Sequence, residues 1–293
     1  MRTARLVLSI MACLSLSVPA AQAAFPGGNG DIAFSRFTRN QTDIWIVYSG
    51  QTGTTRLTHS PRRNEGMPDW NAAGTRVAYS RCGRGKVSKC DIWVMDADGS
   101  NRARLTDTPA QETWPSWSPD GLRVAYTSNA SDDFQDIWVM DADGGNQTRL
   151  TTTPGFDAFP EWSPDGAAIA FTSDRAAVDD IWVMDADGGN PLRLTSGPRA
   201  DERPDWSPDG ASIAFARRGD IWVMDADGSG ERALSETSQD EFAPAFSPNG
   251  LRVAFARHGN DERIGVWNMR VDGTGRVQRT FGRFDFFPDW QPR

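Results

Sequence analysis

A stretch of twelve residues recurs along the chain with little change. It reads WSPDGLRVAYTS from Trp117, and close copies begin at Trp162, Trp206 and Phe246, with a more divergent copy at Trp70. Repetition at a period of about 40–50 residues indicates a solenoid or a β-propeller, in which each copy is one unit that cannot bury its own apolar face. The repeat therefore constrains the fold more than any other feature of the sequence.

Four sequence markers each occur six times. A Pro-x-Trp or Pro-x-Phe motif begins at Pro68, Pro115, Pro160, Pro204, Pro244 and Pro288. An Ile/Val-Ala-aromatic triplet begins at Ile32, Val77, Val124, Ile169, Ile213 and Val253. An Ile/Val-Trp pair begins at Ile44, Ile92, Ile137, Ile181, Ile221 and Val266. A short run like Arg-Leu-Thr contains Leu57, Leu105, Leu150, Leu194, Leu234 and, weakly, Val277. Each marker is β-branched or aromatic and is bounded by turn residues, which predicts four β-strands per repeat.

Two recurring turns connect the predicted strands. Ser118-Pro119-Asp120-Gly121 carries the residues that a type I turn prefers at its first, second and fourth positions. Asp-Gly pairs predict a second hairpin turn, between the third and fourth strands of a repeat. They begin at Asp98, Asp143, Asp187 and Asp227. Each repeat is therefore expected to be a four-stranded antiparallel meander.

The order of the markers predicts how the array ends. After the predicted leader, the chain begins with the marker of the second strand of a repeat, at Ile32. It ends with the marker of the first strand of a repeat, at residues 288–290. The sixth unit is complete only if these two segments pair, and an open array would leave exposed strand edges. We therefore expect an all-β fold: a six-bladed β-propeller of four-stranded antiparallel blades, closed by pairing of the N- and C-terminal strands.

The tryptophans follow the repeat. All but one of the twelve stand at repeated positions, and Trp114 is the exception. Blades of a propeller touch through their faces, and large aromatic side chains fill the wedge-shaped space between them. We expect the tryptophans to have this packing role.

The first 23 residues have the features of a secretory signal peptide. Arg2 and Arg5 give a basic start, residues 6–18 are apolar, and Ala21-Gln22-Ala23 is a small-residue cleavage site. A lipid attached to Cys13 is an alternative interpretation. No later segment is apolar for long enough to span a membrane. The predicted organisation is a signal peptide at 1–23 and one propeller domain at 24–293, exported to the periplasm, the cell surface or the medium.

Charge and cysteine content limit the partners. Without Arg2 and Arg5, the 31 basic residues fall to 29, against 39 acidic ones. Such a surface repels nucleic acid and anionic lipid and favours basic partners. Cys82 and Cys90 remain after the leader, and an even pair in an exported chain predicts a disulfide. Two thiols without neighbouring histidines are a poor ligand set for a metal.

The run PSWSPDGLRVAYTS…DIWVMDADG…RLT resembles the WD-repeat-like units of TolB-type β-propellers. The resemblance covers residues 32–290. It implies an exported binding platform that docks a partner at one mouth of the ring; related blades also cap peptidases of the prolyl oligopeptidase type. TolB itself has an N-terminal α/β domain. Since about eight residues separate the predicted cleavage site from the first strand, we expect the propeller without that domain.

A carboxylate stands three residues before each proline of the Pro-x-Trp motif. The six are Glu65, Glu112, Asp157, Asp201, Glu241 and Asp285. They should lie near the mouth of the central channel, where the chain enters each innermost strand. In a structural interpretation, they are capping side chains that accept backbone N–H bonds. In a functional interpretation, they form a ring of negative charge that binds a divalent cation or the Lys and Arg side chains of a partner.

The same face carries the connections between second and third strands, and we call it the variable-loop face. These connections differ in length, and they span residues 37–42, 82–90, 128–135, 173–179, 217–219 and 257–265. Loops that vary on a constant scaffold commonly carry recognition. A second acidic set precedes the Ile-Trp strand and is expected to make strand-start hydrogen bonds. It comprises Asp43, Asp91, Asp136, Asp180 and Asp220, with Gly265 in the sixth unit.

Signals of an enzyme are few. The chain lacks Gly-x-Ser-x-Gly and His-Glu-x-x-His motifs, and His59 and His258 are its only histidines. We therefore predict a monomeric, non-enzymatic binding or scaffold propeller that docks a protein, peptide or cell-envelope partner at the variable-loop face and channel mouth. The alternative is a metal-assisted hydrolase, lyase or lactonase acting at the same mouth. We expect no cofactor. A divalent cation at the mouth is expected only in the functional interpretation of the six carboxylates.

Overall fold

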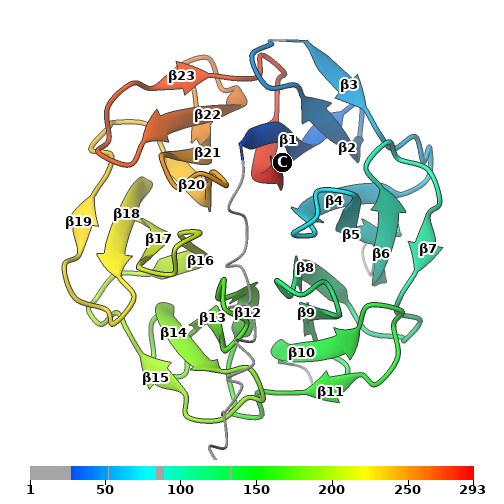
Figure 1. Ribbon diagram of the computed structural model, residues 1–293, viewed down its shortest axis with the longest axis vertical. Coiled ribbons are helices and arrows are strands. Elements are labelled where there is room, and N and C mark those ends of the chain that lie inside the picture. The colour runs from blue at the N-terminus through cyan, green and yellow to red at the C-terminus, as the bar shows by residue number, and fades with distance from the viewer. Residues whose placement is uncertain (1–27, 52, 84–88, 132–133) are drawn as a thin grey trace, which may run out of the picture.

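Strands build the entire described part of the protein. The computed structural model describes residues 28–51, 53–83, 89–131 and 134–293, so the predicted signal peptide at 1–23 lies outside it. Within these ranges the chain forms strands β1 to β24, arranged in six four-stranded sheets, and no helix. Figure 1 shows the sheets following one another in chain order around a central axis. The predicted six-bladed, all-β architecture is confirmed.

Each blade is an antiparallel meander whose strands follow one another from the axis outward. Blade 1 contains β24 (Asp285–Pro292), β1 (Asn29–Thr38), β2 (Gln41–Val47) and β3 (Thr54–Arg56). Blade 2 contains β4 (Asn64–Trp70), β5 (Arg76–Cys82), β6 (Cys90–Asp96) and β7 (Ala103–Arg104). Blade 3 contains β8 (Glu112–Trp117), β9 (Arg123–Ser128), β10 (Asp136–Asp141) and β11 (Thr148–Arg149).

The remaining three blades repeat this order. Blade 4 contains β12 (Asp157–Trp162), β13 (Ala168–Ser173), β14 (Asp180–Asp185) and β15 (Leu192–Arg193). Blade 5 contains β16 (Asp201–Trp206), β17 (Ser212–Arg217), β18 (Asp220–Asp225) and β19 (Arg232–Ala233). Blade 6 contains β20 (Glu241–Phe246), β21 (Arg252–His258), β22 (Ile264–Arg270) and β23 (Val277–Gln278). The outermost strands are very short, which limits the edge that each blade exposes.

The two ends of the chain close the ring. The last strand, β24, pairs antiparallel with the first, β1, so that Ile32 faces Trp290 and Asn29 faces Pro292. Figure 1 shows the C-terminus beside β1, at the inner end of blade 1. The predicted closure by terminal strand pairing is confirmed.

The core is divided among the contacts between blades. Six buried clusters occur, and each combines residues from two neighbouring blades. In one of them, Ile44 and Ile46 of blade 1 pack against Trp70 and Tyr79 of blade 2. The motif tryptophans Trp70, Trp117, Trp162 and Trp290 are all buried. Their predicted role in packing between blades is confirmed.

Glycine is required at both recurring turns. Gly121 has φ +69°, and its N–H donates to the Ser118 carbonyl oxygen at 2.8 Å. Gly144, in the second hairpin of blade 3, has φ +90°. A Cβ there would collide with the Leu105 carbonyl oxygen of blade 2. The missing side chain therefore lets neighbouring blades approach closely.

Cys82 and Cys90 form the predicted disulfide, between the end of β5 and the start of β6. Their Cα atoms are 4.0 Å apart, and the two residues pair directly across the antiparallel ladder. Residues 84–88 of the enclosed loop lie outside the described ranges. The described residues include no helix that is long and apolar enough to cross a membrane.

Candidate functional site

The six predicted carboxylates lie at the beginning of the innermost strands. Five are the first residue of their strand, and Glu65 is the second residue of β4. Each of the six residues is at most 1% exposed, and none of them lines the hollow at the channel mouth. They are therefore enclosed within the blades.

Arginine neutralises five of these six acids. The pairs and their closest N–O distances are Arg36–Asp285 2.5 Å, Arg81–Glu65 3.1 Å, Arg175–Asp157 2.8 Å, Arg217–Asp201 2.5 Å and Arg257–Glu241 3.4 Å. Each of these guanidinium groups also stacks on the tryptophan of the third strand, 4.4–4.9 Å from a ring centroid. Acid, arginine and tryptophan thus connect the inner part of the blade.

Glu112 departs from this pattern. In blade 3, Ser128 stands at the position held by Arg81 in blade 2 and Arg217 in blade 5. The hydroxyl of Thr108 donates to Glu112 instead. Burial raises the pKa of Glu112, and the nearby threonine hydroxyls oppose this shift.

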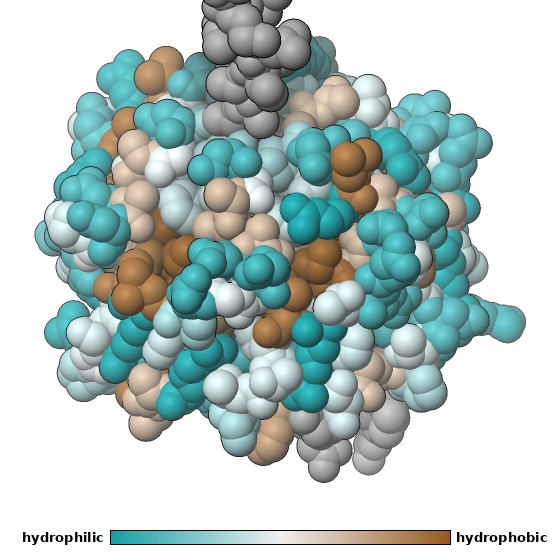
Figure 2. Space-filling model, turned by 60° about the horizontal axis from the view of Figure 1, so that its bottom comes forward, coloured by the Kyte–Doolittle hydropathy of each residue, from teal (hydrophilic) through white to brown (hydrophobic). Residues whose placement is uncertain are grey.

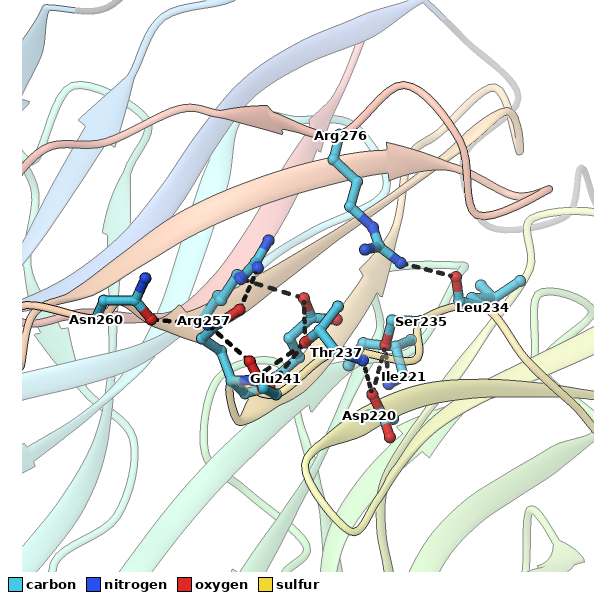
Figure 3. A network of polar contacts seen from close by, with 11 residues as sticks. Asp220, Ile221, Leu234, Ser235, Thr237, Glu241, Arg257, Asn260 and Arg276 are labelled. Atoms are coloured by element: carbon cyan, nitrogen blue, oxygen red, sulfur yellow. Dashed lines mark hydrogen bonds and ion pairs between the residues drawn. The ribbon is translucent and has the colours of Figure 1, made fainter.

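Figure 3 shows the contacts of one of these acids, Glu241, in blade 6. Arg257 Nε lies 3.4 Å from Glu241 Oε1, and the Thr237 hydroxyl donates to the same oxygen at 3.4 Å. Arg257 Nη2 also donates to Gln239 Oε1 at 2.5 Å, and the Thr237 N–H donates to Asp220 at 3.0 Å. Glu241 is therefore held by an arginine and a hydroxyl group, whereas the capping interpretation expected backbone N–H donors. The cation- or partner-binding role suggested for the six carboxylates stays a prediction.

The second acidic set is also paired. Arginines of the outermost strand or its equivalent bind four of these aspartates, in the pairs Arg56–Asp43 2.8 Å, Arg104–Asp91 2.8 Å, Arg149–Asp136 2.8 Å and Arg193–Asp180 2.6 Å. In blade 5, Ala233 replaces the arginine, and Asp220 accepts the Thr237 N–H. In blade 6 both partners are absent, because Gly265 and Gln278 occupy their positions.

The channel mouth is built by the residue before each motif proline. Its φ lies between +51° and +58° in all six blades, at Met67, Trp114, Phe159, Arg203, Ala243 and Phe287. The pairing with the second strand shifts register at this point in every blade. A bulky residue in this conformation costs about 1–3 kcal/mol, so the surrounding structure must enforce it. The bulge places one side chain from each blade at the mouth.

Hydroxyl groups of the preceding blade help to hold the bulge. Four of the six bulge N–H groups donate to a serine or threonine of the neighbouring second strand, at Ser35, Ser80, Thr127 and Thr172. Ala216 and Ala256 stand at the corresponding positions in the other two blades. These bonds also fasten adjacent blades to one another.

Arg203 lies among three aromatic rings at this mouth. Its guanidinium carbon is 5.0 Å from the Trp114 ring centroid, 4.7 Å from Phe159 and 5.0 Å from Phe287. Trp114 meets both phenylalanines edge-to-face, with centroids 4.6 Å apart. Nε of Arg203 is buried and has no hydrogen-bond partner among the described residues, and burial lowers the pKa of this group. The mouth therefore presents a cation held by aromatic faces.

Deeper in the channel, the residue after the motif proline is a carboxylate in four blades, and these four line the channel: Asp69, Glu161, Asp205 and Asp289. Ser116 and Ala245 stand at this position in the other two blades. Asp69 accepts the Trp117 N–H of the next blade at 2.7 Å, and Asp289 accepts the Trp70 N–H at 2.6 Å. The same bond joins Asp205 to the Phe246 N–H, at 2.6 Å. The acids therefore link the inner strands of neighbouring blades.

Burial and mutual repulsion make these channel acids hard to ionise. The pKa of Asp289 is raised to about 7, chiefly by burial. The pKa of Asp69 is raised mainly by burial and, to a smaller extent, by repulsion from Asp289. The pKa of Glu161 is raised mainly by burial and, to a smaller extent, by repulsion from Asp69. Burial also raises the pKa of Asp205. Across the described ranges, however, no three His, Cys, Asp or Glu side chains are arranged to hold a metal ion.

Two adjoining hollows follow the axis. The one on the variable-loop side has a volume of about 100 Å³ and is lined by the bulge residues and the motif prolines. The other, of about 20 Å³, is lined by residues of the Ser-Pro turns such as Pro164 and Ser207. The four channel carboxylates line both hollows, so they lie between them.

Apolar residues elsewhere on the surface are dispersed. Figure 2 shows one face on which separate hydrophobic patches alternate with hydrophilic residues. The large exposed hydrophobic residues belong to several blades, and they are Phe37, Leu122, Phe134, Leu192, Leu251, Val277 and Phe281. Scattered residues of this kind are normal for a protein surface. The aromatic cluster at the channel mouth is therefore the more specific feature.

The sequence contains signals for this mouth that the four repeat markers do not capture. The residue before each motif proline varies among Met, Trp, Phe, Arg and Ala, whereas the proline is constant. Trp114, the single tryptophan outside the repeated positions, is one of these residues. An arginine also recurs at the end of the second strand, at Arg36, Arg81, Arg217 and Arg257, where it pairs with the predicted acids.

The fold and its channel define a six-bladed β-propeller with a closed terminal seam. The chain belongs to the TolB β-propeller family, because the model of the TolB beta propeller domain matches residues 130–293. TolB from Acinetobacter baumannii has a similar structure, with a TM-score of 0.78 and 26% sequence identity. The alignment covers 90% of this chain and 67% of that one.

Curated relatives match shorter stretches. The uncharacterized protein Atu1656 of Agrobacterium fabrum is 33% identical over 92 residues, which cover 31% of this chain and 30% of that protein. Dipeptidyl-peptidase 5 of Porphyromonas gingivalis is 32% identical over 68 residues, which cover 23% of this chain and 10% of that protein. The chain therefore spans less than a third of the length of these two relatives.

Proposed function

We propose that this protein is an exported, non-enzymatic binding propeller that docks a protein or peptide partner at the channel mouth of the variable-loop face. The observation that carries the proposal is the placement of Arg203 among Trp114, Phe159 and Phe287. Aromatic residues and arginine are the side chains that most often dominate binding energy at protein interfaces. The family supports a binding or scaffold role.

The channel mouth is suited to recognition because its side chains differ from blade to blade while the backbone that holds them is the same. Each blade contributes one side chain from the same bulge, while the adjacent proline and tryptophan stay nearly constant. A partner would place an apolar side chain against the rings and offer an oxygen acceptor to Arg203, whose Nε lacks one among the described residues. Such a contact replaces water at a cation that burial has already partly desolvated.

The alternative of a metal-assisted hydrolase, lyase or lactonase has less support. Three of the four channel carboxylates that could serve it, Asp69, Asp205 and Asp289, already accept backbone N–H bonds from the next blade. Three relatives that are named as peptidases share stretches covering only 10–17% of their own length. The similarity to these peptidases is therefore a similarity between propeller repeats.

The proposal is tested by comparing variants of the mouth in a pull-down from cell-envelope extract. Immobilised wild-type protein, Arg203→Leu, Trp114→Ala and the control Leu122→Ala would be compared, and retained proteins identified by mass spectrometry. Leu122 is 66% exposed and directly follows the Ser-Pro-Asp-Gly turn at the other end of the blade.

We expect a partner that binds the wild type and Leu122→Ala but binds both mouth variants at least about tenfold more weakly, as loss of a central interface residue predicts. Melting curves would establish that each variant is folded. Retention of the same proteins by all four baits would refute the proposed site, and a partner lost only with Leu122→Ala would move it to the opposite face.

A further inference from the structure

Blade 6 lacks an ion pair that four other blades share. At the start of the third strand, an aspartate binds an arginine of the outer strand, as in Arg56–Asp43 and Arg193–Asp180. Gly265 and Gln278 replace these two residues in blade 6. Both changes remove side-chain volume from the same place in the blade.

A hollow lies at this place. It has a volume of about 210 Å³ and is lined by Gly265, Gln278, Trp267, Phe281, Arg257 and Arg263, among others. We call it the blade-6 pocket. It opens beside the β21–β22 connection, on the variable-loop face, and contains none of the residues of the channel mouth. The pocket is therefore separate from the proposed docking site.

The remaining groups of the ion-pair site keep their positions. In blade 1, Arg56 Nε donates to the Thr58 carbonyl oxygen at 2.7 Å, and its Nη2 binds Asp43. In blade 6, Gln278 Nε2 donates to the equivalent Thr280 carbonyl oxygen at 2.9 Å. The glutamine thus replaces the first of these bonds, and Gly265 supplies no carboxylate for the second.

Two N–H donors flank the missing carboxylate. A Cβ placed on Gly265 would lie 3.0 Å from Gln278 Nε2 and 3.6 Å from Trp267 Nε1. In the other five blades, this backbone position carries an aspartate side chain. A carboxylate that enters the pocket from solvent can therefore reach both donors.

The charges around the pocket suit an anion. Two arginines and one aspartate, Asp261, line it in a protein whose net charge is −8. Arg263 pairs with Asp261 at 3.2 Å, but both side chains are about 60% exposed, so the pair is weak and can exchange partners. Arg257 stacks on Trp267 and is fixed in place by Glu241.

We propose that the blade-6 pocket binds a carboxylate group in the place of the aspartate that the other blades carry. Gln278 and Trp267 donate hydrogen bonds to it, Arg263 supplies the opposite charge, and Phe281 covers the carbon chain that bears it. The carboxylate belongs either to a small free acid or to an acidic side chain of a bound peptide. The proposal does not depend on the mouth, so Arg203→Leu should leave it unchanged.

Nuclear magnetic resonance of the full chain tests the proposal. The probes are succinate, a capped Gly-Glu-Gly peptide and, as the neutral control, a capped Gly-Gln-Gly peptide at equal ionic strength. We expect saturable shifts of the Trp267 indole N–H and the Gln278 side-chain amide with a carboxylate probe, and none with the neutral peptide. A response to succinate alone identifies a small acid, and a response to the glutamate peptide identifies an acidic side chain.

Variants sharpen the result. Gly265→Asp combined with Gln278→Arg rebuilds the ion pair of the other blades, and it should weaken probe binding at least about tenfold because the pocket is then filled. Arg263→Gln should weaken it as well, and it serves as the test should the double variant fail to fold. Arg283→Gln is the matched control, since Arg283 is an exposed neighbour outside the pocket. The absence of a saturable shift with both carboxylate probes, or equal binding by the filled variant, would overturn the proposal.

Discussion

Four carboxylic acids face one another in the channel, where the backbone of the motif prolines offers no N–H donors. Asp69, Asp205 and Asp289 each accept one backbone N–H bond from the next blade. These bonds, together with the Trp290 N–H that Asp289 also accepts, do not offset the burial that raises the pKa of all three groups. Repulsion from neighbouring acids raises the pKa of Asp69 and Asp205 further. The acids are therefore useful as hydrogen-bonding groups but unfavourable as charges.

This balance predicts a stability that depends on pH. The pKa of Asp289 is about 7 in the folded protein, and that of an aspartate in the unfolded chain is about 3.9. Unfolding between these values releases protons, so the free energy of unfolding falls as the pH rises from about 4 to about 7.

We therefore expect Asp289→Asn to stabilise the protein relative to the wild type, increasingly from pH 4 to pH 7, with the difference constant above. The amide oxygen can still accept the Trp70 N–H. The gain is at most about 4 kcal/mol, from about 1.4 kcal/mol per pKa unit, and repulsion shared among the acids makes it smaller. Urea unfolding at a series of pH values measures it. A difference that is independent of pH would contradict this account.

At the scale of the strand, the recurring unit is a connection across a blade. The acid that starts the innermost strand pairs with an arginine at the end of the second strand, which stacks on the tryptophan of the third. Three consecutive strands are thus held together at the variable-loop end. Loops that differ in length can attach there because the strand ends beneath them are fixed.

Blades 1 and 3 offer a matched comparison of this connection. Asp285 is bound through both oxygens by Arg36, at 2.5 and 2.8 Å, whereas Glu112 has a hydroxyl donor in place of arginine. Asp285→Asn should cost about 3 kcal/mol, because it leaves a largely buried guanidinium without its counter-ion. Glu112→Gln should cost less than about 1 kcal/mol, since the amide oxygen still accepts the bond. Equal losses in chemical denaturation would show that the arginine pair is not what stabilises the strand start.

At the scale of the whole molecule, closure depends on one seam. Each blade buries its core residues against its two neighbours, so an open ring exposes two faces at once. Blade 1 lies at that opening because its innermost strand comes from the other end of the chain.

We expect removal of residues 286–293 to abolish cooperative thermal melting, since blade 1 then lacks its inner strand and β1 becomes an exposed edge. Removal of Arg293 alone is the control, because its side chain is 54% exposed and its partner Asp31 still accepts the Ser49 N–H. Differential scanning calorimetry measures both. A truncated chain that melts like the parent would exclude closure as the source of cooperativity.

The repeat made the architecture predictable. Residues such as Trp117 and Ile137 recur at fixed spacing, and that spacing determines the blade number, the strand order and the terminal pairing. The Cys82–Cys90 disulfide followed from the even number of cysteines left after the predicted leader, together with the predicted export. These features depend on pattern, which a sequence displays directly.

The channel could not be derived in the same way, because its form depends on the direction of side chains. A bulge at Trp114 and its equivalents shifts the register of every innermost strand, and nothing in simple alternation predicts it. The acids at the strand starts, such as Glu65, are consequently buried beside arginine, whereas Asp69 and Asp289 face the axis. The partner arginines were visible as a repeated residue type, but their pairing required the geometry.

The pairing of β24 with β1 also determines how the molecule would respond to mechanical force. Asn29 faces Pro292, so in this antiparallel pair the outermost residues of both terminal strands lie at the same end of blade 1. Tension applied through the two termini would load the hydrogen bonds of the seam one after another, as in opening a zipper, rather than all together in shear. A propeller pulled in this way would begin to open at blade 1.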